Sequence, residues 1–294
     1  METISILGCG WLGLPLAEEL QKRYEIKGSY RSKKTQQALE DSGIEYYAID
    51  LEDDEFDVEF FECDVLIIAV PPSLRLQSAD THLKQLQLVN EYLDEGTHVI
   101  YCNSTAIYGV GENLTENQAN DSSPFAQFEK VFKDNPCTVL RLAGLVDFDR
   151  TIVTSLINKK IAIDHREPVN LVHREDVIQV IEEVIEQEKW DEVYNVCAPE
   201  HSNKEEVYGH WAMLLGLDEL EFVEKEKPMM KTISSDKLIK DLNYTFIYPN
   251  PVEFNLDSDE IESDPSSDFL SKHKKKSSIS NNKKDLNIQT MIFI

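Results

Sequence analysis

The chain opens with a short apolar stretch, residues 4–7, that leads into a glycine-rich turn and then into an amphipathic segment. The turn reads G-x-G-x-x-G, and this order predicts a strand, a sharp turn and a helix. Gly10 leaves the backbone bare for a pyrophosphate, and Gly13 lets the helix pack close to the strand. The free N–H groups at the start of the helix suit a phosphate. We therefore predict dinucleotide binding here rather than a turn without a ligand. The residues expected to bind are Gly8, Gly10, Trp11, Leu12 and Gly13.

Strand-like and helix-like segments alternate along the first half of the chain. The run 64–70 is apolar after its first residue, which is typical of a parallel strand buried on both faces. Such alternation predicts an α/β fold with a Rossmann-type, doubly wound parallel sheet. The strands expected in this sheet cover residues 3–7, 25–30, 45–50, 64–70, 97–102 and 137–142.

The rhythm changes after about residue 150, but order is expected to continue. Apolar residues at helical spacing predict a helix over 175–187, with Asp176 at its start, where a carboxylate can cap free N–H groups. A strand is expected at 194–196, and helices at 203–216 and 236–242. The predicted organisation is an NAD(P)-binding Rossmann domain over 1–165, a smaller C-terminal α/β substrate lobe over 166–255, and a disordered tail over 256–294.

The chain is strongly acidic, with a formal net charge of −26. This charge disfavours nucleic acid and anionic membranes as partners, because both are polyanions, but it leaves room for a small phosphorylated ligand. The five cysteines form no C-x-x-C pair, and no apolar run approaches the length of a membrane span. We expect a cytoplasmic protein with a small-molecule substrate and no metal site. A long helix over 74–93 carries a narrow apolar stripe that could face the sheet or form a homodimer.

The end of the second expected strand bears on the choice of cofactor. In dinucleotide-binding folds an acidic side chain at this place holds the ribose hydroxyls of NAD, whereas an arginine accommodates the extra phosphate of NADP. No acidic residue occurs between positions 26 and 39. We therefore predict NADP, with NAD as the alternative. The side chains suited to a phosphate are Ser29, Arg31, Ser32 and Lys33.

Several motifs follow one another in an order that resembles the extended short-chain dehydrogenase/reductases, a family that includes sugar-nucleotide epimerases and dehydratases. The first is a Ser/Thr-rich strand end followed by Tyr108-Gly109. The others lie at 141–144, 170–177, 194–196 and 234–238, and together they span about residues 3–250.

The resemblance implies roles for particular residues. Ser104 matches the family's catalytic Ser/Thr, which polarises a carbonyl or hydroxyl of the substrate near the nicotinamide, and Thr105 is a possible substitute. Asp50 and Leu51 resemble the pair that contacts the adenine. The crevice at the carboxyl ends of the strands adds the last cofactor-binding candidates, which are Ala69, Val70 and Pro71.

The chain departs from that family at the acid/base pair. The family carries Tyr-x-x-x-Lys, in which the lysine lowers the pKa of the tyrosine phenol. Aligned on Ser123-Pro124, this chain has Phe125 at the tyrosine and Glu129 at the lysine, and it has Leu7 where a further glycine would stand. These departures indicate an atypical subgroup, similar to the YeeZ-like proteins, which keep the nucleotide fold and lose the pair.

Two functions remain open. The first is an NAD(P)-dependent oxidoreductase or epimerase-like enzyme in which another group moves the proton. His173 is a candidate, because an imidazole titrates near neutrality, although a histidine bonded within the core is the alternative. Glu129 is a weaker one. The second function is a dinucleotide-binding sensor or interaction protein without chemistry. A less favoured hypothesis comes from the Ala-Val-Pro-Pro that ends at position 72 and from residues 8–13, which also resemble prephenate-type and β-hydroxyacid dehydrogenases.

Overall fold

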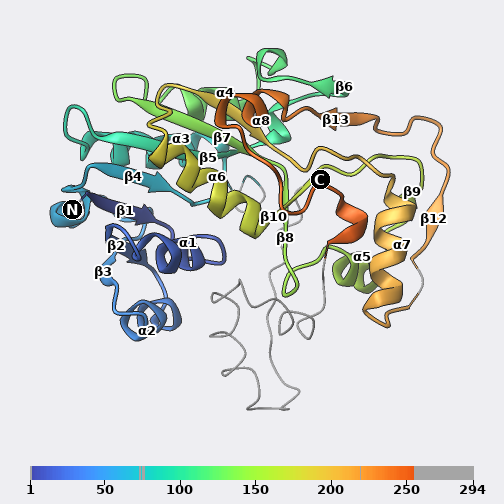
Figure 1. Cartoon of the computed structure of the whole chain (residues 1–294), viewed down its shortest axis with the longest axis horizontal. Coiled ribbons are helices and arrows are strands. Elements are labelled where there is room, and N and C mark those ends of the chain that lie inside the picture. Colours follow the sequence, from blue (N-terminus) through green and yellow to red (C-terminus); the bar gives the residue numbers. More distant parts are fainter. Residues whose placement is uncertain (1, 73, 75–76, 219, 255–294) are drawn as a thin grey trace.

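The structure, a computed structural model, describes residues 2–72, 74, 77–218 and 220–254. Its centre is a seven-stranded sheet in the order β11-β7-β5-β4-β1-β2-β3, and every pairing is parallel (Figure 1). The predicted doubly wound Rossmann-type sheet is thus confirmed. The strands are β1 (Thr3–Leu7), β2 (Glu25–Tyr30), β3 (Glu45–Ala48), β4 (Val65–Ile68), β5 (His98–Ser104), β7 (Cys137–Leu142) and β11 (Val193–Val196).

Two groups of helices flank this sheet. In the first group α1 (Gly13–Leu20) contacts α2 (Lys33–Asp41) and α6 (Arg174–Glu186), and in the second α3 (Ala79–Glu91) contacts α4 (Pro124–Glu129). The helix expected over 74–93 corresponds to α3, which is shorter than expected among the described residues. It buries His82, Gln85, Leu86 and Val89, so part of its stripe packs inward. A dimer face on this helix stays a prediction.

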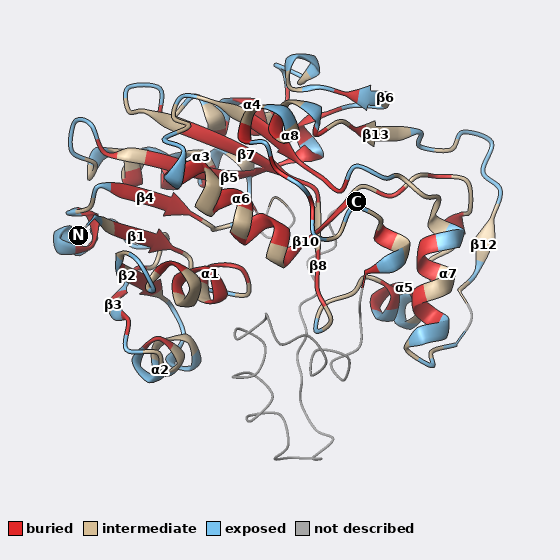
Figure 2. Ribbon diagram, viewed as in Figure 1, coloured by how far each residue is buried: buried red, intermediate tan, exposed pale blue. Residues whose placement is uncertain are grey.

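A second apolar core lies beside the sheet and is built around α5 (Val153–Lys159) and α7 (Lys204–Leu214) (Figure 2). The expected helices at 203–216 and 236–242 are confirmed by α7 and α8 (Asp236–Leu242). The remaining strands form three short pairs, which are β8 (Gly144–Val146) with β10 (Leu171–His173), β9 (Ile163–Asp164) with β12 (Phe222–Val223), and β6 (Gly111–Leu114) with β13 (Lys231–Ile233). The 3-10 helices are η1 (Val58–Phe61), η2 (Thr105–Ile107), η3 (Glu116–Gln118) and η4 (Pro251–Glu253).

Elements of the predicted 166–255 lobe occur in both cores. Strand β11 completes the main sheet, and the apolar side of α6 belongs to the main core, whereas α7 belongs to the second core. The boundary at residue 165 stays a prediction. The tail predicted over 256–294 lies outside the described residues.

The expected cap of α6 is wrong. The side chain that accepts from a backbone N–H at the start of this helix is His173, not Asp176. Asp176 is fully buried and its carboxylate accepts from the Tyr244 hydroxyl at 2.7 Å and from the N–H groups of Ile247 and Tyr248 at 2.8 and 3.1 Å. It therefore fastens the segment after α8 to α6, a contact between distant parts of the chain that helical periodicity cannot indicate.

Candidate functional site

The three glycines of the first turn have different structural roles. Gly8 adopts a φ of +102°, and a Cβ there would lie 2.8 Å from Val70 Cγ2. A Cβ on Gly13 would lie 2.2 Å from the Gly8 carbonyl oxygen, so helix α1 can pack on β1 only with glycine at this position. A Cβ on Gly10 would meet nothing within 4 Å. Gly10 is therefore bare toward open space, as the approach of a pyrophosphate requires.

Trp11 connects this turn to the segment after β8. Its indole N–H donates to Asp149 Oδ1 at 2.8 Å. The guanidinium carbons of Arg150 and Arg174 lie 4.6 and 4.5 Å from its ring centroid, within the range of cation–π contacts. Arg174 also donates to the Trp11 carbonyl oxygen at 3.2 Å. The predicted cofactor turn thus has two arginines at its side, while Leu12 is buried beneath it.

The residues expected at the adenosine end lie together. The Arg31 guanidinium is largely exposed and lies 3.6 Å from Asp50 Oδ1, so the end of β2 meets the segment after β3, which includes Leu51. Ser32 accepts from the Thr35 N–H at 3.1 Å and caps α2. Ser29 accepts from the Gly8 N–H at 2.7 Å and is buried, so its hydroxyl supports the glycine turn. Ser32 and Lys33 are exposed to solvent like Arg31.

The carboxyl ends of β1, β4 and β5 lie at one edge of the sheet, because these strands are parallel neighbours. The Ala69 N–H donates to the Leu7 carbonyl oxygen at 2.9 Å, and Val70 lies against Gly8, so Ala69 and Val70 lie beside the glycine turn and Pro71 follows them in the chain. Strand order reverses between β1 and β4, and ligands of such sheets bind in the crevice outside that point.

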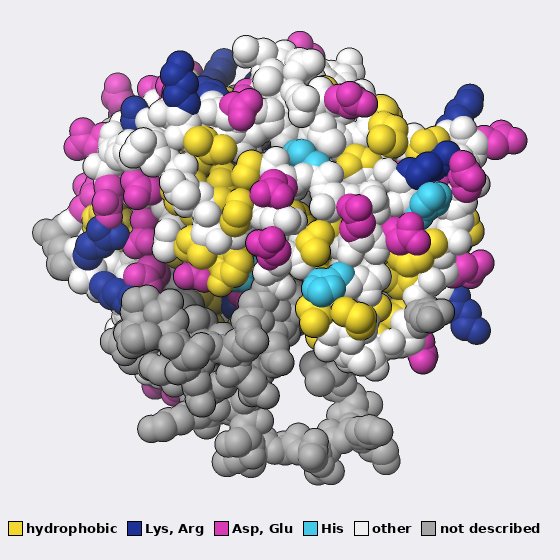
Figure 3. Space-filling view, turned by 45° about the vertical axis from the view of Figure 1, so that its right-hand side comes forward, with side chains coloured by type: hydrophobic (Ala, Val, Ile, Leu, Met, Phe, Trp, Pro, Cys, Tyr) yellow, Lys and Arg dark blue, Asp and Glu magenta, His cyan; other side chains and the backbone are white. Residues whose placement is uncertain are grey.

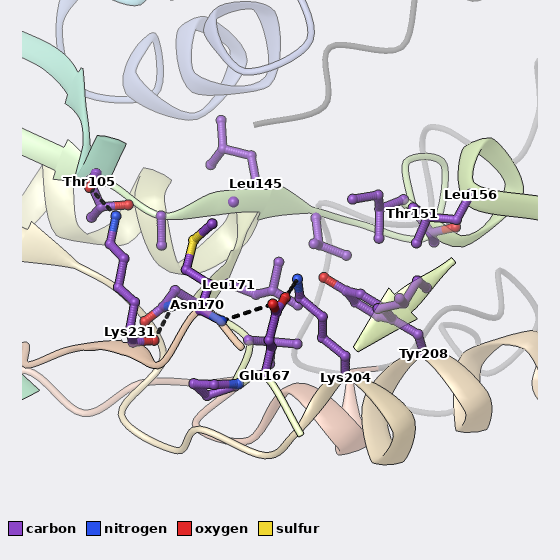
Figure 4. Close-up of a pocket in the computed structure, with 18 of the residues that line it drawn as sticks. Thr105, Leu145, Thr151, Leu156, Glu167, Asn170, Leu171, Lys204, Tyr208 and Lys231 are labelled. Atoms are coloured by element: carbon purple, nitrogen blue, oxygen red, sulfur yellow. Dashed lines mark hydrogen bonds and ion pairs between the residues drawn. The ribbon is translucent and has the colours of Figure 1, made fainter. Parts of the chain in front are cut away.

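A cavity of about 240 Å³ continues from this edge toward the second core. Ser104 and Thr105, at the end of β5, line it together with Arg150, whose side chain also packs on Trp11. Figure 4 shows apolar side chains on its walls, and these include Leu145, Leu156, Leu171 and Tyr208. The structure thus brings two predicted catalytic residues into one cavity and links that cavity to the predicted cofactor turn.

Sequence reasoning missed Lys231, which lies in the same cavity. Its ammonium group donates to the carbonyl oxygens of Thr105 at 2.8 Å and Tyr108 at 3.2 Å, and Figure 4 shows the side chain pointing at Thr105. Burial lowers the pKa of Lys231 from its ordinary value, because desolvation disfavours the charged amine. Lys231 stands 126 residues after Thr105, in β13, and no local pattern in the sequence marks it.

A second charged group in the cavity is already neutralised. Glu167 Oε2 accepts from Lys204 Nζ at 2.7 Å, and its Oε1 accepts from the Met229 N–H at 2.9 Å. Burial alone would raise the pKa of Glu167, but these hydrogen bonds and the charges of Lys204 and Lys225 hold it below its ordinary value. Figure 4 shows Glu167 and Lys204 side by side.

Of the two residues that replace the family's acid/base pair, Phe125 is buried and Glu129 is partly buried. Phe125 packs edge-on against Phe128 with ring centroids 5.9 Å apart. Glu129 receives two hydrogen bonds from the Arg141 guanidinium, both of 2.8 Å, and one from Asn103 Nδ2 of 2.7 Å. Neither residue lines the cavity.

His173 does not line the cavity either. It is buried at the N-terminus of α6, where Nδ1 accepts from the Glu175 N–H at 3.3 Å and Nε2 lies 3.5 Å from Asp147 Oδ1. Its ring centroid is 3.8 Å from that of Tyr248. This is the setting of a histidine bonded within the core, and its catalytic role stays an untested prediction.

Two absences hold for the described part of the chain. No helix there is long and apolar enough to cross a membrane. No group of three or more His, Cys, Asp or Glu side chains is placed to hold a metal ion among those same residues.

Comparison with known proteins gives a relative along nearly the whole chain. Protein YeeZ from Escherichia coli K12 is 31% identical over 279 residues, which cover 87% of this chain and all of that protein. No family model matches the chain.

Solved structures share the fold. A short-chain dehydrogenase/reductase superfamily protein from Agrobacterium tumefaciens with bound NAD has a TM-score of 0.68 at 13% identity, over 85% of this chain and 95% of that one. The UDP-glucuronic acid 4-epimerase of Bacillus cereus, in complex with UDP-glucuronic acid and NAD, has a TM-score of 0.66 at 17% identity, over 83% and 93%. The dTDP-glucose 4,6-dehydratase of Bacillus anthracis, in complex with NAD, has a TM-score of 0.65 at 15% identity, over 86% and 94%.

Proposed function

The chain belongs to the family of protein YeeZ and has the dinucleotide-binding fold of the epimerases and short-chain dehydrogenase/reductases, and on that basis we propose that it is an NAD(P)-dependent oxidoreductase or epimerase of a small substrate. The observation that carries the proposal is the cavity that joins Ser104 to the glycine turn through Arg150 and Trp11. Reaction centre and cofactor turn are then parts of one site.

The proposed cofactor site fits the residues present. The bare backbone at Gly10 and the start of α1 would hold the pyrophosphate, and Asp50 would lie near the adenosine. The cofactor would supply a hydride acceptor or donor. Arg31 favours NADPH, because an exposed guanidinium can form bidentate contacts with the additional phosphate. The Arg31–Asp50 ion pair would have to open for this contact.

Ser104 and Lys231 are the proposed catalytic pair. The Ser104 Oγ accepts from the Ala106 N–H at 3.1 Å, which fixes the hydroxyl and leaves its proton available for a substrate oxygen. Lys231, with its lowered pKa, would take up or give the proton that the Tyr-x-x-x-Lys pair moves in the wider family. Thr105 holds Lys231 in place through its carbonyl oxygen, so Thr105 is a positioning residue in this proposal.

Calorimetric titration of the full chain with NADPH and NADH tests cofactor binding. We expect binding of both, with NADPH tighter, and a smaller difference between them in Arg31→Gln. Turnover is then followed by the absorbance of the reduced nicotinamide across carbonyl and hydroxyl substrates. Ser104→Ala and Lys231→Met should lose turnover and keep cofactor binding, whereas Lys159→Gln, on the exposed side of α5, should match the unsubstituted protein. Failure of both cofactors to bind would overturn the proposal.

A dinucleotide-binding sensor is the second candidate. The observation that favours it is the conversion of the acid/base positions to buried Phe125 and ion-paired Glu129. A sensor would bind NADPH or NADH, show no turnover with any substrate, and change its oligomeric state or partner binding with the cofactor. Turnover that depends on Ser104 would exclude it.

A further inference from the structure

The charge of the cavity is opposite to the charge of the protein. The chain carries −26, and Figure 3 shows Asp and Glu side chains spread over one face of the molecule. The cavity, in contrast, is lined by four cations and one carboxylate. Its charged residues are Arg150, Lys204, Lys225, Lys231 and Glu167.

The cations of the cavity differ in how far they are compensated. Lys204 and Lys225 lie 2.7 and 3.9 Å from the Glu167 carboxylate and share its charge. Arg150 and Lys231 form no ion pair with any described residue. The Arg150 guanidinium instead lies over the face of the Trp11 ring. The Lys231 ammonium group donates to backbone carbonyl oxygens.

Burial makes this lack of compensation costly. Desolvation lowers the pKa of both Arg150 and Lys231. The Asp149 carboxylate, which lies beyond ion-pair distance, partly opposes this effect on Arg150. A half-buried cation without a counterion is stabilised when an anion binds beside it. The cavity therefore offers uncompensated positive charge at Lys231, beside Thr105, and at Arg150.

We propose that the cavity binds a small substrate that carries an anionic group, a carboxylate or a phosphate, which is neutralised by Arg150 and Lys231. That the bound anion is a substrate rests on the proposed function, whereas the anion site itself is inferred from the residues that line the cavity. The size of the cavity, about 240 Å³, is below the roughly 300–1,000 Å³ of pockets for larger ligands, which favours a small acid over a nucleotide sugar.

Binding of simple anions to the full chain without cofactor tests the site directly. Malonate and inorganic phosphate are titrated calorimetrically at constant ionic strength, with neutral malonamide as the matched ligand control. We expect saturable binding of at least one anion and none of malonamide. Because the protein as a whole repels anions, diffuse attraction would not produce such binding.

Variants locate the bound anion. Arg150→Gln and Lys231→Met should each raise the dissociation constant at least tenfold, while Lys159→Gln leaves it unchanged. At a pH near the lowered pKa of Lys231, anion binding should be accompanied by proton uptake, because the anion raises that pKa, and this uptake should vanish in Lys231→Met. Anion binding that is equal in all variants, or absent for both malonate and phosphate, would overturn the proposal.

Competition with NADH distinguishes the anion-site proposal from the proposed function, and it shows whether the anion binds in the cavity or at the pyrophosphate site. Anion and NADH that bind together support a substrate site, whereas mutual exclusion would show that the anion occupies the pyrophosphate site and would overturn the inference. NADH binding with turnover of neutral substrates only would refute the anionic substrate and leave the proposed function intact. Anion binding without any NADH binding would refute the proposed function and leave the anion site intact. A preference for carboxylates or phosphates then names the substrate class.

Discussion

Glu129 and Arg141 form a bidentate ion pair between α4 and β7, with two hydrogen bonds of 2.8 Å and side chains that are 13% and 6% exposed. Arg141 also donates to the Tyr108 hydroxyl at 2.7 Å, which in turn donates to Asn195 on β11. The glutamate that stands at the family's catalytic lysine is thus the counterion of a buried arginine. Through Arg141 and Tyr108 it is part of a hydrogen-bond network that links α4, β7 and β11.

Restoring the family's pair should therefore not restore its chemistry. In Phe125→Tyr/Glu129→Lys the new ammonium would face Arg141 without a counterion, and we expect loss of stability and no gain in turnover. Arg141→Met, which leaves Glu129 partly buried and unpaired, should cost about 3–5 kcal/mol in the free energy of unfolding, measured by urea denaturation. Phe125→Tyr alone serves as the control. A stable and more active double variant would contradict the structural role.

The glycines of the turn should separate folding from binding. In Gly10→Ala the new methyl meets open space, so stability should change by no more than about 0.5 kcal/mol, while NADPH affinity falls at least tenfold. In Gly13→Ala the methyl would press on the Gly8 carbonyl, and we expect about 1–3 kcal/mol of destabilisation. Urea denaturation and calorimetry give both quantities. Unchanged affinity in Gly10→Ala would remove the pyrophosphate from this turn.

Lys231 should be visible in the pH dependence of turnover. The ammonium form of Lys231, which also pairs with the anionic group, is the acid, so kcat/KM for reduction of a carbonyl substrate should fall as pH rises through the pKa that Lys231 has in the free enzyme. Burial places that inflection below the ordinary lysine value of about 10.4. The inflection should disappear in Lys231→Met and persist in Ser104→Ala at a lower rate. A profile in Lys231→Met that keeps the same inflection would assign the proton to another group.

Glu167 should make the protein lose stability in acid. Its pKa is lower in the folded chain than in the unfolded one, so it contributes stability above its unfolded pKa, and this contribution is lost as pH falls through the folded pKa. Lys204→Met should cost about 1.5–3 kcal/mol at pH 7, because it removes a hydrogen-bonded charge from a carboxylate that is only 5% exposed. The difference in the free energy of unfolding between the unsubstituted protein and Lys204→Met should shrink at pH 3. Lys159→Gln is the control, and a difference independent of pH would speak against this account.

The amino-acid sequence by itself determined the sheet, most of the helices and the glycine turn. Apolar runs such as 64–70 and helical spacing such as that of α6 are local patterns, and local patterns reflect which faces must be buried. The glycines act through contacts within one strand, turn and helix, so Gly13 could be assigned from its neighbours alone. The family resemblance added Ser104, which the structure places in the cavity.

Tertiary structure alone decided which charged groups meet. Lys231 reaches Thr105 from a strand near the end of the described chain, Glu129 is held by Arg141 across two elements, and Asp176 binds the segment after α8 instead of capping its own helix. The physical reason is that hydrogen bonds and ion pairs depend on distances in space, whereas residues far apart in sequence carry no periodic signal of such pairings.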